Sequence, residues 1–347
     1  MSVVESPHVP APTGGYADLA AEVRRLGLLR PRPGFYAALL AVSLFALAAT
    51  VTGLLALRES WWAILLAPVL AVVSTQIAFF GHDAGHRQIT RRRGVSQVLG
   101  LVSGNLLNGL SYTWWIAKHN AHHAHPNDLT SDPDVYPGAL VFDADHALGR
   151  RRLASWLTRH QAWLFFPLLT LEAMNLHVSS ARALMRPGAR HRGLESALLV
   201  MHVAAYLALL LSALSWQQVI VFAVVHQAVF GIYLGCSFAP GHKGMPVLKP
   251  DQAEDPLLRQ VLTSRNVRGG MFVDYALGGL NYQIEHHLFP SMPRPNLRHA
   301  QVVVRRFCET RSVRYEEVTA RASYASAVRH LHAVGAELRN ARRRCRH

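Results

Sequence analysis

Four long apolar runs constrain the fold of this chain more than any other feature. They cover residues 35–57, 61–80, 196–214 and 218–238. A helix rises about 1.5 Å per residue, so about 20 apolar residues cross the hydrocarbon core of a bilayer. Half of the 347 residues are hydrophobic and only 16% are charged, which is unusual for a soluble protein. The runs therefore predict an all-α integral membrane protein with four transmembrane helices.

The connections between these runs predict two helical hairpins. Residues 58–60 join the first two runs and residues 215–217 join the last two, so almost no chain lies at that side of the membrane. Of the 36 Lys and Arg residues, only Arg58 lies in these connections. Because positively charged loops stay in the cytoplasm, we expect a multi-pass protein of the cell membrane with both termini cytoplasmic.

The runs divide the chain into an N-terminal cytoplasmic segment, a membrane domain with a cytoplasmic helical cap, and a basic helical tail, which cover residues 1–34, 35–306 and 307–347. We do not expect the first segment to be a signal peptide, because it contains Glu5, Asp18 and Glu22 and leads into a run of span length. We expect residues 1–14 to be disordered and residues 16–29 to form a helix at the membrane interface.

Two further apolar stretches are predicted to be buried or to lie at the interface without crossing. Residues 95–110 contain Gly104, Asn105 and Asn108, and residues 163–171 are too few to span a bilayer.

Three histidine-rich motifs lie outside the apolar runs. Their side chains are His82 and His86 in GHDAGH, His119, His122 and His123 in KHNAHHAHPND, and Gln283, His286 and His287 in QIEHH. Residues three and four apart share one face of a helix, so each motif projects two or three of these groups in one direction. All three motifs lie on the same side of the membrane only if residues 95–110 do not cross it.

The number of imidazoles indicates two metal ions. Seven histidines exceed the three or four ligands that one zinc ion takes. They suit two metal ions with borderline-to-hard ligand preferences, and iron is the metal of that group that activates oxygen. We therefore expect two iron ions, with O₂ as co-substrate. Cys236, Cys308 and Cys345 form no CxxC pattern, which argues against a zinc ribbon or a disulfide framework. The basic residues form no patch interleaved with aromatics, which argues against nucleic acid as a partner.

The motifs HDAGH, HNAHH and QIEHH, in this order around two pairs of apolar runs, resemble those of the membrane fatty acid desaturases. The resemblance covers residues 35–306 and implies oxygen-dependent removal of two hydrogens from an acyl chain, giving a cis double bond. It also implies that the seven motif histidines bind the two irons. An eighth ligand would be His242 in FAPGHKGMP, where this chain has Gly241 in place of the Asn found in many relatives.

The QxxHH form of the third motif resembles front-end desaturases, which act between an existing double bond and the carboxyl end. Gln283 stands where most desaturases of this type have His, and an amide is a weaker ligand than imidazole. Many front-end relatives carry a fused cytochrome b5 domain with an HPGG motif, which does not occur here. We therefore expect a separate acidic donor, a ferredoxin or rubredoxin with its reductase, and an acyl substrate carried by CoA, carrier protein or phospholipid within membrane lipid.

Carboxylates close to the motifs are expected to orient the imidazoles through their other ring nitrogen. The candidates are Asp83, Asp274 and Glu285. No catalytic acid, base or nucleophile is expected beyond the metal site. Four aromatic residues near the motifs either line an acyl tunnel or form an aromatic belt at the membrane interface; they are Tyr112, Trp114, Trp115 and Tyr282.

Three other functions have to be weighed against this interpretation. A b-type cytochrome could hold haem between His202 and His226, although that leaves the three motifs unexplained, and these two histidines could instead be bonded within the helix bundle. A metal transporter would place its ligands at mid-membrane depth, not at one end of the spans. An acyl-chain or lipid hydroxylase uses the same histidine motifs, and the sequence leaves this alternative open.

Overall fold

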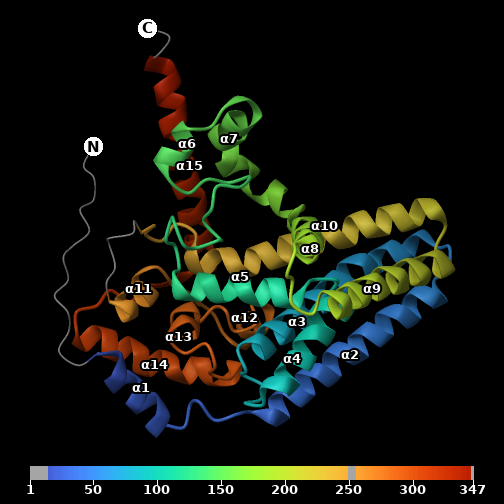
Figure 1. The fold of residues 1–347 in the computed structure, drawn as a ribbon, viewed down its shortest axis with the longest axis horizontal. Coiled ribbons are helices and arrows are strands. Elements are labelled where there is room, and N and C mark those ends of the chain that lie inside the picture. Colours follow the sequence, from blue (N-terminus) through green and yellow to red (C-terminus); the bar gives the residue numbers. More distant parts are fainter. Residues whose placement is uncertain (1–14, 249–254, 345–347) are drawn as a thin grey trace.

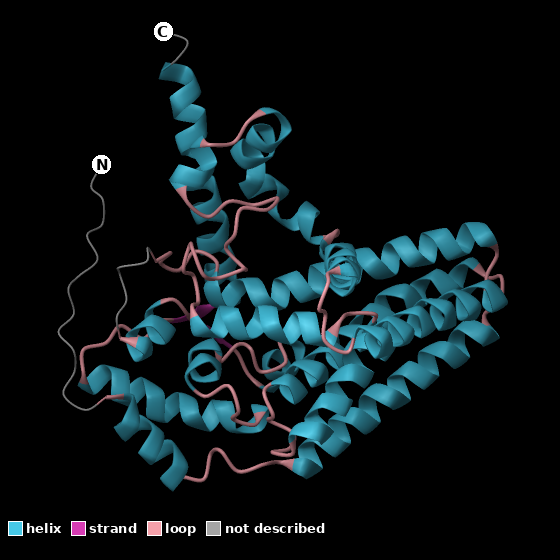
Figure 2. Cartoon of the chain, viewed as in Figure 1, coloured by secondary structure: helices cyan, strands magenta, loops and turns pink. Residues whose placement is uncertain are grey.

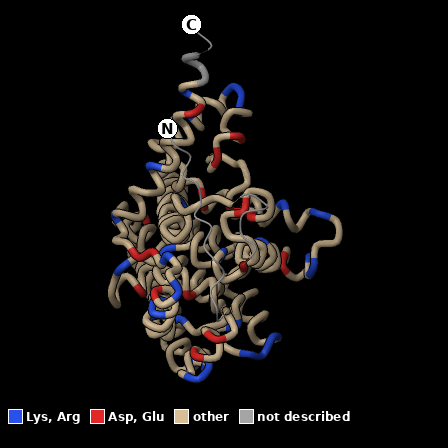
Figure 3. The backbone as a smooth tube through the Cα atoms, turned by 90° about the vertical axis from the view of Figure 1, so that its left-hand side faces the viewer, with Lys and Arg blue, Asp and Glu red and all other residues tan. Residues whose placement is uncertain are grey.

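The computed structural model describes residues 15–248 and 255–344, with side chains up to residue 340. Most of the described chain is helical (Figure 2). The prediction of disorder for residues 1–14 lies outside the described residues. In the view of Figure 3, Lys and Arg lie at scattered positions and do not form a single patch.

The four helices of span length are α2 (Pro33–Ala56), η1 with α3 (Trp61–Leu65 and Leu66–Gly85), α9 (Arg192–Ala213) and α10 (Trp216–His242). They run alongside one another (Figure 1), and α3 contacts both α2 and α10, while α9 contacts α2 and α10. Each predicted run thus lies in a helix that is long and apolar enough to cross a membrane, which indicates a membrane protein. Pro33 starts α2 at a position where its missing N–H costs nothing, and Ser215 and Gln218 form a capping box at the start of α10.

Two of these helices continue past their apolar runs, and these extensions begin the polar end of the molecule. Helix α3 ends at Gly85, so His82 lies in its last turn. Helix α10 ends at His242, four residues beyond the last apolar residue of its run. The spans themselves therefore carry histidines to one end of the bundle.

The other helices surround that end. They are α1 (Tyr16–Arg25), α4 (Arg93–Leu101), the π-helical turn η2 (Val102–Leu106), α5 (Tyr112–Ala124), α6 (Ala144–Leu148), α7 (Arg152–Leu169), α8 (Glu172–Met185), α11 (Pro256–Leu262), α12 (Met271–Ala276), α13 (Gln283–Leu288), α14 (Arg294–Thr310) and α15 (Ala320–Arg344). Ser111 caps α5 by accepting from the Trp114 N–H, and Asp255 caps α11 by accepting from the Leu257 N–H.

The all-α prediction missed a small sheet. Strands β1 (Asn266–Arg268) and β2 (Glu317–Thr319) pair in parallel, with Val267 opposite Val318. Each strand has only three residues, too few for the alternation of apolar and polar positions to mark a strand in the sequence.

The helix expected over residues 16–29 is present as α1, but its surroundings differ from the prediction. Its apolar residues Leu19, Ala20 and Val23 are buried in one cluster with residues of α14, including Leu297 and Val304. This side of α1 therefore covers protein and does not face lipid.

The two ambiguous apolar stretches do not form helices of span length within the described residues. Residues 95–110 are divided between α4, η2 and a loop, which together lie against α3 and α9. Residues 163–171 form the end of α7 and its corner with α8, where Phe165 and Leu169 are buried while Trp163, Phe166 and Leu171 are exposed.

Candidate metal centre

One group of four imidazoles gathers where α3, α5 and α13 meet. It consists of His82, His86, His119 and His286, each of which offers a ring nitrogen within 4.8 Å of the others. The Nε2 atoms of His86 and His119 lie 2.8 Å apart. The ring of His286 lies 4.8 Å from that of His82 and 4.9 Å from that of His86, measured between centroids. Residues more than 200 positions apart in the sequence thus point at one small volume.

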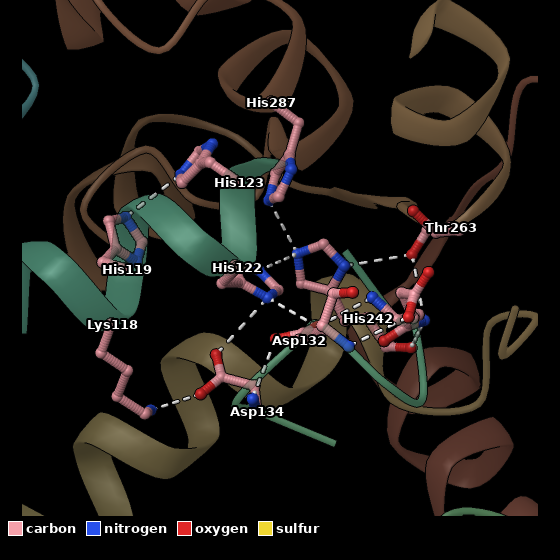
Figure 4. Close-up of polar contacts among 12 residues, drawn as sticks. Lys118, His119, His122, His123, Asp132, Asp134, His242, Thr263 and His287 are labelled. Carbon is pink, nitrogen blue, oxygen red and sulfur yellow. Dashed lines mark hydrogen bonds and ion pairs between the residues drawn. The ribbon is translucent and has the colours of Figure 1, made fainter. Parts of the chain in front are cut away.

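A second group of three imidazoles lies beside the first. His122, His242 and His287 come from α5, α10 and α13, and their ring nitrogens also lie within 4.8 Å of one another. The Nε2 atom of His242 lies 3.3 Å from that of His122 and 2.9 Å from that of His287. Figure 4 shows these rings turned towards one another.

His123 lies between the two groups. Its ring is stacked on that of His287 with 4.2 Å between centroids, and its Nε2 atom lies 3.1 Å from Nε2 of His119. All eight histidines that the sequence singled out are therefore brought together, in two neighbouring groups and one side chain between them.

The second group is oriented by acceptors on the other ring nitrogen. The Nδ1 atom of His122 lies 2.9 Å from Asp132 Oδ2, that of His242 lies 3.1 Å from the carbonyl oxygen of Thr263, and that of His287 lies 2.8 Å from Gln260 Oε1. Each acceptor places the proton of a neutral imidazole on Nδ1 and leaves the Nε2 lone pair directed into the group.

Converging lone pairs are the arrangement that a cation requires. Nε2 atoms 2.9–3.3 Å apart cannot hydrogen-bond when both hold a lone pair and neither holds a proton. Two ligand atoms about 2.1 Å from one metal ion and at right angles to each other are themselves about 3 Å apart. The donor set of the second group therefore fits a bound metal ion.

The first group fits a metal ion by a separate observation. Within residues 15–248 and 255–344, Nε2 of His82 and both ring nitrogens of His286 are buried without a hydrogen-bond partner. Buried polar atoms in proteins are seldom left unpaired. Nδ1 of His82 lies 3.1 Å from Asp83 Oδ1, so its free Nε2 carries the lone pair, as in the second group.

Burial also favours the neutral form of several of the imidazoles. Removal from water, followed by the proximity of other imidazoles, lowers the pKa of five of them well below the usual value. They are His86, His119, His123, His286 and His287. A neutral imidazole is the form that binds a metal.

Of the three carboxylates expected to orient imidazoles, only Asp83 does so. Arg294 holds Asp83 on the other side through Nε, 3.0 Å from Oδ2. Asp274 instead accepts from Asn281 Nδ2 at 2.9 Å and lies 3.3 Å from the Tyr282 hydroxyl. The prediction for Asp274 was therefore wrong.

The prediction for Glu285 was also wrong. Its carboxylate accepts from Asn266 Nδ2 at 2.6 Å and from the Tyr315 hydroxyl at 2.8 Å, facing away from the histidines. Burial raises the pKa of Glu285 to about 7 against the lowering effect of these two donors. Adjacent residues on a helix point about 100° apart, so Glu285 faces the core behind α13 while His286 faces the metal groups.

Sequence reasoning missed the three acceptors of the second group, Asp132, Gln260 and Thr263. Asp132 lies ten residues after His122 in a loop, and its carboxylate also accepts from the backbone N–H groups of Asn127 and Asp134. The DPD triplet at residues 132–134 is the sequence feature that could have pointed to Asp132. Gln260 and Thr263 carry no motif that could have marked them.

Gln283 lies beside the second group. Its amide nitrogen is 2.9 Å from Nε2 of His242. The adjacent Gly241 is what makes this approach possible, because a Cβ at that position would lie 2.7 Å from Cγ of Gln283. The amide thus replaces an imidazole at the edge of the metal centre, and the glycine leaves room for it.

A cavity of about 480 Å³ opens beside the histidines. Its walls are mainly apolar and come from α5, the loop before α6, α7, α8 and α10, including Phe142, Leu168 and Phe238. His119, His122, His242 and Gln283 form part of its lining. Trp115 also lines it and stacks on His119 at 4.6 Å, whereas Tyr112, Trp114 and Tyr282 are not among its lining residues.

The charged residues of the cavity lie next to the metal centre. Lys118 pairs with Asp134, whose other oxygen is 3.6 Å from Nδ1 of His122 (Figure 4). Lys243 donates to the backbone carbonyl of Asp134 at 2.8 Å and lies over the ring of Phe142. The cavity thus has a polar end at the histidines and an apolar remainder.

The intramembrane histidines are bonded within the bundle. Nδ1 of His202 lies 2.9 Å from the carbonyl oxygen of Leu106. Nδ1 of His226 lies 3.1 Å from the Tyr206 hydroxyl, and the Tyr206 ring is 6.3 Å from that of His202 and 5.5 Å from that of His226. Nε2 of His226 lies 3.5 Å from the Ser74 hydroxyl, so both histidines have partners within the bundle, as the alternative interpretation of the sequence expected.

Four helices of span length and two histidine groups at one end define a membrane protein with a candidate metal centre. The chain belongs to the fatty acid desaturase family, whose model matches residues 59–319. It is 29% identical to a Delta(8)-fatty-acid desaturase of Arabidopsis thaliana over 340 residues, which are 91% of this chain and 73% of that protein.

Other relatives agree with this assignment. The chain is 30% identical to a Delta(8)-fatty-acid desaturase of Helianthus annuus over 324 residues, 86% of this chain and 68% of the relative. It is 28% identical to a Delta(5) fatty acid desaturase of Caenorhabditis elegans over 312 residues, 86% of this chain and 69% of the relative.

Proposed function

We propose that this protein is an oxygen-dependent acyl desaturase that introduces a cis double bond into a fatty acyl chain. The observation that carries the proposal is the pair of histidine groups, each with its ring nitrogens within 4.8 Å of one another, in the wall of a mainly apolar cavity. The names of the relatives, which include Delta(8) and Delta(5) desaturases, support the same reaction.

Two iron ions would be held by the histidines. His82, His86, His119 and His286 would hold one, and His122, His242 and His287 the other, with His123 between them. Bound iron supplies the oxidising power, from O₂ and two electrons, that is needed to break an unactivated C–H bond. Gln283 lies at the edge of the second group, where its amide can act as a weak ligand or hold a water molecule.

The protein's own residues would hold and position the acyl chain. The apolar cavity walls exclude water and bind the methylene groups. Asp83, Asp132, Gln260 and Thr263 fix the orientation of the imidazoles through Nδ1. Lys118 and Lys243 lie at the polar end of the cavity, suited to the polar end of the substrate, whether that is a CoA, carrier-protein or phospholipid ester.

The proposed topology has two hairpins, α2 with α3 and α9 with α10, in the cell membrane. The membrane domain covers residues 35–306, and the smaller helices form a cytoplasmic cap over the histidine end, with both termini on that side. The excess of Lys and Arg outside the spans supports this orientation. A separate acidic donor of ferredoxin or rubredoxin type would supply electrons, because a basic surface attracts such a partner.

The test is mass spectrometry of lipids from cells that express the protein and are fed deuterated saturated acids, with His286→Ala as the control. A new deuterated unsaturated chain that is absent from the control supports desaturation, and its double-bond position identifies the regiochemistry. A hydroxylated chain would instead show that the protein is an acyl-chain hydroxylase. If neither product forms when an active electron donor is present, the proposal is overturned for these acids.

A further inference from the structure

Helix α7 buries polar residues beside Phe165 and Leu169 and exposes large apolar residues, which is unusual for a helix surrounded by water. Its buried side carries Ser155, Thr158 and Gln161, and each of these is at most 1% exposed. Its exposed side carries apolar residues at helical spacing, with Trp163 81% exposed. They are Leu153, Trp156, Trp163 and Phe166. A surface helix in water normally shows the opposite pattern.

The buried polar side is accounted for by contacts with the rest of the protein. Gln161 donates through Nε2 to the carbonyls of Val141 at 3.0 Å and Leu331 at 3.1 Å, and accepts from the Val141 N–H at 3.0 Å. Helix α15 packs along this side so closely that a Cβ on Gly335 would lie 2.7 Å from the Thr158 carbonyl oxygen. The orientation of α7 is therefore fixed, and its apolar side has to face outward.

The outward apolar residues continue onto α8 and reach the spans. Leu171, Met174, Val178 and Met185 are exposed along α8, which contacts α9 and α10 directly. We call the exposed large apolar residues of α7, α8 and the corner between them the α7–α8 apolar face. They are Leu153, Trp156, Trp163, Phe166, Leu171, Met174, Val178 and Met185. Helix α9, which α8 contacts, also exposes apolar residues, including Val200 and Leu211. Figure 1 shows α7 running across the direction of the spans, and its last residue, Leu169, packs against Gly231 of α10.

The charges around this face also fit a lipid surface. Residues 150–195 contain eight arginines and only two acidic residues. Glu195 is fully buried and accepts from Asn105 and Ser111, and Glu172 lines the cavity. Basic residues with exposed tryptophan and leucine are typical of helices that lie in the membrane interface and attract anionic headgroups.

We propose that the α7–α8 apolar face lies in the boundary between headgroups and acyl chains of an anionic leaflet, as a membrane contact in addition to the four spans. The partner is the lipid bilayer itself. One consequence concerns the cavity, because Phe165, Leu168 and Leu176 on the inner side of α7 and α8 line it. The wall between the cavity and the lipid is then one helix thick.

The test places the photocrosslinker benzoylphenylalanine at single positions of the full chain, reconstituted in nanodiscs of phosphatidylcholine and phosphatidylglycerol. The test position replaces Trp163. Val200, 68% exposed on a span helix, is the positive control. Val302, 69% exposed on α14, is the negative control, because it is the only large apolar residue of that helix that is exposed, so it belongs to no apolar face. Illumination is followed by mass spectrometry of the adducts.

Lipid adducts at position 163 are expected at a yield similar to that at 200 and at least about fivefold above that at 302. Omitting phosphatidylglycerol should lower the yield at 163 and leave that at 200 unchanged. Crosslinks at 163 to a second copy of the chain, or no adduct at 163 when 200 reacts, would overturn the proposal. Trp156, on the same side of α7, provides a second test position if the first variant does not fold.

Discussion

Gln283 occupies the space that a side chain at position 241 would need, since a Cβ on Gly241 would lie 2.7 Å from its Cγ. The same amide lies 2.9 Å from Nε2 of His242. Two departures from the usual motifs, Gln in place of His and Gly in place of Asn, are thus one structural feature: the glycine accommodates the glutamine.

The first prediction follows from this contact. Gly241→Ala should displace Gln283 and His242 and cost about 1–3 kcal/mol through overpacking, with loss of metal from the second group and of turnover. In Gly241→Ala with Gln283→Ala the clash is removed, so the double variant should be no worse than Gln283→Ala alone. Gly193→Ala is the matched control, because a Cβ there meets nothing within 4 Å. Strictly additive losses in turnover would contradict the coupling.

The buried ion pair between Arg294 and Asp83 gives the second prediction. Arg294 Nη2 lies 2.7 Å from Asp83 Oδ2, with both side chains at most 5% exposed. Arg294→Met leaves a buried carboxylate without its partner, which should cost about 3–5 kcal/mol in free energy of unfolding. Arg268→Met, at a pair with a 66% exposed arginine side chain, should cost less than about 1 kcal/mol. Unfolding in mixed micelles measures the free energy of unfolding of both variants. Equal losses of stability would show that Asp83 does not depend on Arg294 as a buried partner.

Gln260 gives the third prediction. Its Oε1 lies 2.8 Å from Nδ1 of His287 and its Nε2 donates to the carbonyl oxygen of His123 at 2.9 Å. Gln260→Leu should weaken metal binding by about 10–100-fold, as loss of such a supporting bond usually does. Cobalt titration followed by optical absorption measures the affinity. Gln97→Leu, which removes an exposed amide bonded to His191, should leave the titration unchanged; an unchanged titration for Gln260→Leu would show that the bond is dispensable.

The fourth prediction concerns the cavity. Leu168→Trp adds bulk to its wall and should raise KM for long acyl chains more than for short ones, without changing iron content, because the histidines are untouched. Leu153→Trp, on the exposed side of the same helix, is the control. The comparison uses chains of two lengths and the wild-type protein; a uniform loss for both lengths, or loss of iron, would mean that Leu168 does not bound the acyl site.

The spans and the histidines could be predicted from the sequence because both rest on local patterns. Apolar runs of span length and residues three or four apart on a helix need no knowledge of the fold. The ends of the helices could not be predicted as well. His82 and His242 are polar residues that follow apolar runs, and only the structure shows that α3 and α10 continue through them.

The residues that orient the imidazoles could not be predicted in the same way. Asp83 adjoins His82 just as Glu285 adjoins His286, yet only Asp83 contacts an imidazole. Which side of a short helix faces the metal groups depends on packing across the whole chain. Gln260 lies 27 residues before His287 and contacts it through the packing of α11 on α13, a long-range contact that no local pattern marks.

The central claim is that the two histidine groups bind two iron ions. The most direct test is the metal content of the purified protein in nanodiscs, measured by inductively coupled plasma mass spectrometry. We expect two iron atoms per chain in the wild type. His286→Ala and His287→Ala remove one ligand from different groups, so each should retain about one iron atom or fewer. One iron atom per chain in the wild type, or two in either variant, would contradict the assignment of two histidine groups to two iron ions.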